Sequence, residues 1–189
     1  MLGFALTLVL AVAAEEVPAP LVLTDEETVL LAAREIVVRD SGQGSVIGVV
    51  DVRATPRVLL EEVLNLPARV EEVGPLQQVS IYHEGPSSLK VRMEVGMLGI
   101  RAAFHVAYDV DWDAGWCTFH LDPARENDID STDGSYQVYA AGDGARLVYR
   151  SEATASGPTP GWLRDMLTSH SMTQQMEGMR VRAETRSGG

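Results

Sequence analysis

The sequence predicts an α+β domain in which a curved antiparallel sheet of seven strands wraps around a long C-terminal helix. From residue 76 to residue 155, nearly every segment is a β-rich run followed by a turn. The last segment, residues 157–184, instead opens with prolines and continues with a helical pattern. A curved sheet needs a cover for its concave face, and this helix is the element long enough to provide one.

The composition limits the classes of function. A chain of 189 residues is long enough for one domain with a sizeable core. Its formal net charge of −12 argues against nucleic-acid binding, which needs a basic surface, and against electrostatic docking on anionic lipids. Cys117 is the one cysteine, so neither an intrachain disulfide nor a thiolate metal cluster can form. We expect no cofactor.

The N-terminus carries an apolar run over residues 2–14, which is too short to span a bilayer. It ends in an Ala-x-Ala-like site followed by Glu15 and Glu16, which predicts a secretory signal peptide over residues 1–14. We therefore expect a periplasmic or secreted protein without a stable membrane anchor, although transient membrane contact stays open. The alternative is a buried N-terminal helix, since no Lys or Arg precedes the apolar run.

A linker and a short helix are predicted over residues 15–34, where Thr24 and Glu27 have the spacing of a capping box. A short β run follows at residues 35–40, and a β-rich strand begins at residue 45. The main domain is expected over residues 35–185, with a tail at residues 186–189.

Two short helices are predicted after that first long strand. Thr55 can cap and Pro56 can open the first of them. Its apolar residues fall on one side, namely Leu59, Leu60, Val63 and Leu64. Leu66-Pro67 ends it, and a second short helix is predicted over residues 68–73. Six further strands are predicted over residues 76–84, 87–97, 100–112, 116–122, 135–141 and 145–155.

An acidic stretch precedes the penultimate strand and resembles a calcium loop at first sight. Counted from Asp128, an EF-hand would need glycine at the sixth position and glutamate at the twelfth. The sequence has Asp133 and Tyr139 there. We therefore predict an acidic loop in which Asp133-Gly134 makes a turn, and no metal site.

Three stretches resemble the START-like helix-grip (SRPBCC) superfamily, namely "GVVDVRATPRVLLEEVLNL", "DIDSTDGSYQVY" and "LVYRSEATASGPTPGWLRDML". The similarity is to its polyketide cyclase/dehydrase-like and coenzyme-Q-binding-type branch and covers roughly residues 35 to 185. The resemblance implies a deep apolar cavity between sheet and helix that holds a lipid, sterol, quinone or polyketide.

Side-chain alternation independently predicts one apolar and one charged sheet face. In the strand from residue 100, the apolar face carries Ile100, Ala102, Phe104, Val106, Tyr108 and Val110, and the other face carries Arg101, His105, Asp109 and Asp111. On the last helix, one stripe comprises Met172, Met176, Met179 and Ala183, and a second comprises Leu163, Met166, Leu167 and His170.

We interpret the apolar face as a binding surface for a hydrophobic small molecule, since methionines suit an adaptable site. The expected ligand contacts are Val91, Met93, Val95, Phe104, Val106, Tyr108, Tyr149, Trp162, Met172 and Met176. The hydroxyls of Tyr108 and Tyr149 would orient a polar head group. A plain hydrophobic core is the alternative for each of these residues.

No catalytic residue is predicted, and we do not expect an enzyme. The four histidines lack metal-ligand spacing, and Cys117 is expected to be an inert buried thiol. A polyketide aromatase/cyclase or isomerase on the same fold remains an alternative. An interaction module is another, because the resemblance implies respiratory or ribosomal partners; the export signal and the acidic charge speak against the ribosomal role.

Overall fold

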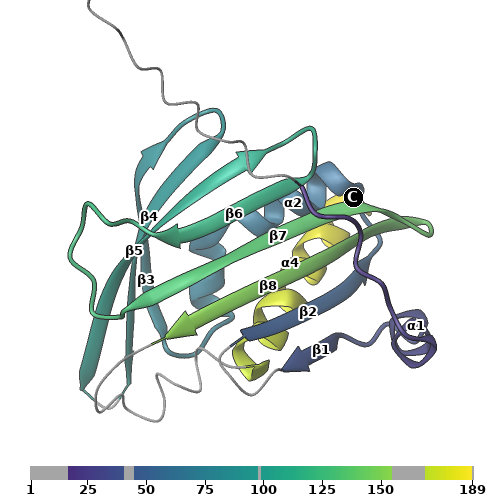
Figure 1. Cartoon of the computed structure of the whole chain (residues 1–189), viewed down its shortest axis with the longest axis horizontal. Helices are drawn as coiled ribbons and strands as arrows, with labels where there is room; N and C mark the ends of the chain where they lie inside the picture. Colours follow the sequence, from purple (N-terminus) through teal and green to yellow (C-terminus); the bar gives the residue numbers. More distant parts are fainter. Residues whose placement is uncertain (1–16, 41–44, 98, 155–168, 189) are drawn as a thin grey trace, which may run out of the picture.

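One antiparallel sheet of eight strands forms the body of the protein in the computed structural model, which describes residues 17–40, 45–97, 99–154 and 169–188 (Figure 1). The strands are β1 (Val37–Asp40), β2 (Ser45–Val52), β3 (Leu76–Glu84), β4 (Ser88–Met97), β5 (Ile100–Asp111), β6 (Trp116–Leu121), β7 (Ser131–Ala141) and β8 (Gly144–Thr154). Their order across the sheet is β1-β2-β8-β7-β6-β5-β4-β3. The predicted fold class is therefore confirmed.

The predicted number of seven strands was one too low. The short β run near residue 35 forms an edge strand, β1, which pairs antiparallel with β2 from Val37–Val49 to Asp40–Val46. Four residues suffice because β2 supplies a continuous row of backbone partners on that side.

The predicted turn at Asp133-Gly134 is also wrong, because both residues lie inside β7. Asp133 pairs with His120, and Gly134 pairs with Phe119. A Cβ atom on Gly134 would overlap the Phe119 ring and the Arg150 carbonyl oxygen. Glycine is thus needed here for close packing across the sheet, and not for a turn.

The helices are α1 (Asp25–Ala32), α2 (Pro56–Leu64), the 3₁₀ helix η1 (Leu66–Glu71) and α4 (Ser169–Ser187). The Thr24–Glu27 capping box of α1 is present. Thr55 caps α2 by accepting a hydrogen bond from the Val58 amide at 3.3 Å. The second predicted helix is a 3₁₀ helix that begins two residues early, at Leu66, because proline is well tolerated in a first helical turn.

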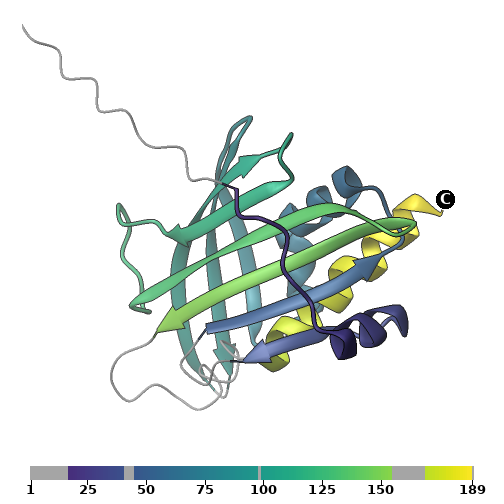
Figure 2. The ribbon, with the colours of Figure 1, turned by 45° about the vertical axis from the view of Figure 1, so that its right-hand side comes forward.

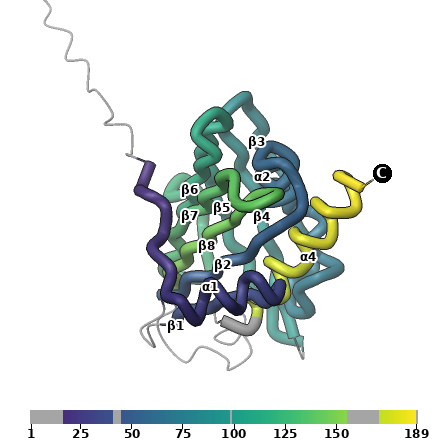
Figure 3. The backbone as a smooth tube through the Cα atoms, turned by 90° about the vertical axis from the view of Figure 1, so that its right-hand side faces the viewer, coloured from purple at the N-terminus to yellow at the C-terminus, as the bar shows by residue number. Residues whose placement is uncertain are grey.

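Helix α4 packs on the concave face of the sheet, and the chain before α1 crosses the opposite face (Figures 2 and 3). On that outer face, the Gln137 side-chain amide donates to the Pro18 carbonyl at 2.6 Å. The predicted inward stripe of α4 is confirmed, since Met172, Met176, Met179 and Ala183 are all buried. The second predicted stripe and Trp162 lie outside the described residues, apart from His170, whose side chain is also not described.

Candidate ligand-binding cavity

A cavity of about 90 Å³ lies between the concave face of the sheet and the first turns of α4. Its apolar wall consists of Val46, Val73, Leu76, Met93, Val95, Phe104, Val106, Phe119 and Met172. Polar atoms reach it from Arg69, Thr132, Ser151, Ser171, Gln175 and three tyrosines, Tyr108, Tyr136 and Tyr149. Typical small-molecule sites enclose about 300–1,000 Å³, so a lipid-sized ligand requires the wall to yield. Met93 and Met172 are the flexible side chains in that wall.

The structure brings seven of the ten predicted contact residues to this cavity, namely Met93, Val95, Phe104, Val106, Tyr108, Tyr149 and Met172. Val91 and Met176 are buried in the same hydrophobic core but do not line the cavity. Trp162 lies outside the described residues.

The pairing of β4 with β5 explains why these side chains point inward. Met93 lies opposite Phe104, and Val91 lies opposite Val106, so each pair occupies one face of the sheet. The intervening pair, Arg92 and His105, occupies the other face. The strict alternation visible in the sequence therefore places the apolar set under α4.

Four aromatic rings form one wall of the cavity. Tyr136 stacks on Tyr149 with ring centroids 4.5 Å apart, and Phe119 lies 5.4 Å from Tyr136 and 5.7 Å from Tyr108. Sequence reasoning missed Tyr136, although its cross-strand position opposite Cys117 and Tyr149 marks it as inward.

Among the described residues that line the cavity, Arg69 on η1 is the charged one, and sequence reasoning did not single it out. Its side chain is buried, with the residue only 4% exposed. The guanidinium donates to the Val63 carbonyl at 2.6 Å, to the Tyr136 hydroxyl at 3.1 Å and to the Gln175 amide oxygen at 3.3 Å. All three acceptors are uncharged, and within the described ranges the Arg69 Nε has no hydrogen-bond partner.

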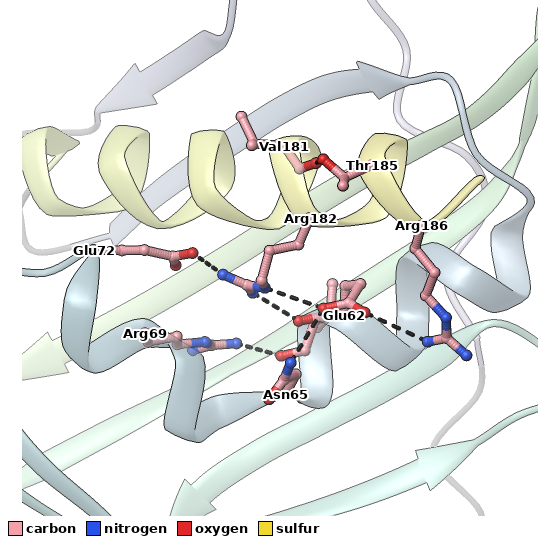
Figure 4. A network of polar contacts seen from close by, with 9 residues as sticks. Glu62, Asn65, Arg69, Glu72, Val181, Arg182, Thr185 and Arg186 are labelled. Carbon is pink, nitrogen blue, oxygen red and sulfur yellow. Dashed lines mark hydrogen bonds and ion pairs between the residues drawn. The ribbon is translucent and has the colours of Figure 1, made fainter. Parts of the chain in front are cut away.

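Two carboxylates close in sequence to Arg69, those of Glu62 and Glu72, are engaged by α4 (Figure 4). Arg182 forms ion pairs with Glu62, at 3.1 Å, and with Glu72. Gly178 leaves room for this arrangement, because a Cβ atom there would overlap the Glu72 carboxylate. The network thus fixes α4 to α2 and η1 without neutralising Arg69.

Burial controls the protonation of the cavity groups. For Arg69, burial is the largest influence and lowers the pKa. The interactions with Tyr136, Tyr108 and Tyr149 outweigh burial, so the pKa of Arg69 is raised overall and the guanidinium stays charged. Burial also raises the pKa of Tyr108 and of Tyr136. Both hydroxyls are therefore neutral near pH 7. Burial raises the pKa of the Cys117 thiol to about 12, which makes it a poor nucleophile.

The described lining residues are better suited to binding a small molecule than to transferring protons. They include no Asp, Glu or His side chain that would titrate near neutral pH. They offer apolar contact along most of the wall and hydrogen-bond donors at the Arg69–Tyr136 side.

The acidic loop between β6 and β7 has a structural role in the sheet. The Asp128 carboxylate accepts a hydrogen bond from the Ala103 amide at 2.7 Å, and the Asn127 side chain accepts one from the His105 amide at 2.6 Å. These side chains occupy the part of β5 that extends beyond its pairing with β6. The hydrogen bond from the Ala124 amide is the main cause that holds the pKa of Asp122 at about 2. No group of three or more potential metal ligands occurs in the described part of the chain.

Comparison with known proteins places the fold. No protein-family model and no curated protein matches the sequence. Among solved structures, the Zhui aromatase/cyclase from Streptomyces sp. R1128 is similar with a TM-score of 0.63 at 16% identity, covering 75% of this chain and 94% of that one. The STAR-related lipid transfer protein from Xanthomonas axonopodis has a TM-score of 0.63 at 13% identity, over 78% and 92% of the two chains.

A START superfamily protein from Mycobacterium smegmatis is similar as well, with a TM-score of 0.59 at 16% identity, over 75% and 98% of the two chains. The chain has the START-like helix-grip fold. The resemblance seen in the sequence is thereby confirmed at the level of the fold. None of the described helices combines the length and apolar character needed to cross a membrane.

Proposed function

We propose that this protein binds a hydrophobic small molecule in the cavity between the sheet and α4. The observation that carries the proposal is the cavity itself, which is lined by residues of the main hydrophobic core and has a mostly apolar wall. Interiors of this kind are normally filled, so a space bordered by flexible methionines favours a ligand site over a plain core.

The fold neighbours support binding without selecting a ligand. They include a lipid transfer protein as well as an aromatase/cyclase. The small volume of about 90 Å³ favours a slender ligand, or a larger one that displaces Met93 and Met172. A carrier of a sterol- or quinone-like lipid, as the sequence suggests, would need that displacement.

The test is calorimetric titration of the full chain with alkanols and alkanoates from hexyl to decyl. We expect saturable binding in the micromolar range, since apolar burial contributes about 25 cal/mol per Å² and association costs reduce it. Ala102→Trp should abolish binding, because Ala102 is buried on the inner face opposite Val95. Arg101→Glu, an exposed neighbour on the same strand, serves as the matched control and should bind normally. Absence of saturable binding by every member of both series contradicts the proposal.

A second candidate is an aromatase/cyclase-type enzyme, favoured by the Zhui neighbour and by the Arg69–Tyr136 pair at the cavity. If the protein is such an enzyme, it should convert a polyketide chain to a cyclised product, and Tyr136→Phe should slow the conversion. Binding of the polyketide without conversion supports the carrier instead.

The proposal also places the protein outside the cytoplasm. Support comes from the sequence of residues 1–14 alone, which lie outside the described residues. N-terminal sequencing of the protein from its native host should find Glu15 at the start, whereas retained Met1 in a soluble cytoplasmic product would contradict export.

A further inference from the structure

Arg69 has the environment of a cation that lacks its counter-charge. Burying a guanidinium is costly unless it is paired with an anion, and a full set of hydrogen bonds only reduces that cost. Its three hydrogen-bond acceptors are a backbone carbonyl, a tyrosine hydroxyl and a side-chain amide. No carboxylate lies within ion-pair distance of Arg69 in the described ranges of the chain, and its Nε has no partner there.

The fold provides carboxylates close by but directs them elsewhere. Glu72, which directly follows η1, is engaged by Arg182, and Glu62 is shared between Arg182 and Arg186. Among the residues that the structure describes, therefore, Arg182 and Arg186 of α4 have carboxylate partners and Arg69 of η1 has none (Figure 4).

The unpaired cation lines the cavity, beside hydrogen-bonding groups of Tyr136, Ser171 and Gln175. A planar guanidinium matches the two oxygens of a carboxylate, and a pairing of this kind is among the stronger hydrogen-bonded contacts in proteins. The apolar part of the lining, which includes Val95, Phe104 and Met93, suits a hydrocarbon chain.

We propose that Arg69 is the counter-charge for a ligand carboxylate, so that the protein selects a monoanionic apolar acid over neutral lipids. This inference rests on the proposed function and adds the chemical class of the ligand. Without a cation, an ionised carboxylate binds an apolar cavity more weakly than the matching alcohol does, because it loses its hydration. The sign of the preference between acid and alcohol therefore reports the role of Arg69.

The experiment compares octanoate with octan-1-ol and methyl octanoate by calorimetry at pH 7.5. We expect octanoate to bind the wild-type protein at least about tenfold more tightly than either neutral compound. Arg69→Met should reverse this preference while still binding the alcohol. Arg101→Met removes the same charge from an exposed position and should leave the preference unchanged.

The wild-type measurement stands alone if Arg69→Met does not fold. As a second readout, carboxyl-labelled octanoate bound to the wild type at pH 6 should show the ¹³C shift of the ionised acid. Equal or tighter binding of the alcohol or the ester, or a protonated bound acid, overturns the inference and leaves the proposed function intact. If none of the three compounds binds, and no alkanol or alkanoate from hexyl to decyl binds saturably, both the inference and the proposed function are contradicted.

Discussion

The two halves of α4 meet the rest of the protein by different means. The anchored half, residues 179–187, is held by ion pairs of Arg182 with Glu62 and Glu72 and of Glu184 with Arg34, the last at 2.7 Å. Glu184 also accepts a hydrogen bond from the Arg53 backbone amide at 3.0 Å. The cavity half, residues 169–176, presents Ser171, Met172 and Gln175 to the ligand cavity. The same helix is thus fixed by polar contacts at its C-terminal end and lines the cavity at its N-terminal end.

This difference is not visible in the apolar stripe that both halves share. Met172 and Met179 are 3% and 0% exposed, so their burial does not distinguish the two halves. What separates them is the density of polar anchors, together with Gly178 between the halves. Helix–sheet folds can therefore combine a stable core with a yielding cavity by concentrating ion pairs at one end of a helix.

The largest expected effect is a loss of stability on truncating a core side chain, and we compare one away from the cavity with one beside it. Leu60 on α2 is fully enclosed, whereas Leu76 borders the cavity. Leu60→Ala should lower the free energy of unfolding by about 4 kcal/mol and Leu76→Ala by about 2 kcal/mol, because a side chain beside a cavity has fewer contacts to lose. Urea denaturation followed by tryptophan fluorescence measures both. Equal losses would remove the distinction between the two ends.

An intermediate effect is expected from the polar contacts of α4. Arg182→Met leaves two largely buried carboxylates, Glu62 and Glu72, short of a partner, and should cost about 2–3 kcal/mol. Gln175→Ala removes one hydrogen bond to Arg69 and should cost about 1 kcal/mol or less. The two losses are compared by thermal unfolding in low and high salt. A greater loss of stability for Gln175→Ala than for Arg182→Met would show that the cavity half, and not the anchored half, holds α4 in place.

The smallest effect concerns alkaline pH. The folded pKa of Cys117 is raised from 9.0 to about 12, so its contribution to stability is fully present below pH 9 and is lost as the pH rises toward 12. At pH 10 the loss amounts to about 1 kcal/mol. Cys117→Ala should therefore show a shallower decline between pH 8 and pH 10 in chemical denaturation. An unchanged slope would mean that the thiol is more accessible than its burial indicates.

Much of the cavity could be predicted from strand alternation. A period of two fixes which side chains share a face, and this rule correctly assigns Met93, Phe104 and Tyr108 to the concave face. Alternation cannot reveal a side chain that is buried by distant elements. Arg69 lies in a short charged stretch typical of a surface helix, and its burial depends on Tyr136 and Gln175, which are 67 and 106 residues away in sequence.

The errors have the same physical origin. Asp133-Gly134 has the composition of a turn, but Gly134 serves to admit the Phe119 ring from the neighbouring strand. The edge strand β1 lies within the β run predicted at residues 35–40, but it was not counted in the sheet, because four residues do not reveal that β2 provides their partner. At Gly134 a contact across the sheet overrides the local preference of the sequence, whereas at β1 such a contact agrees with it.

We expect the cavity half of α4 to contact a ligand and the anchored half not to do so. ¹³C-methyl-methionine NMR during titration with octanoate tests this directly, because Met93 and Met172 line the cavity and Met179 lies buried in the anchored half. We expect saturable shifts of the Met93 and Met172 methyl signals with little change at Met179. Shifts confined to the exposed Met97, or of equal size at Met179, would contradict this account.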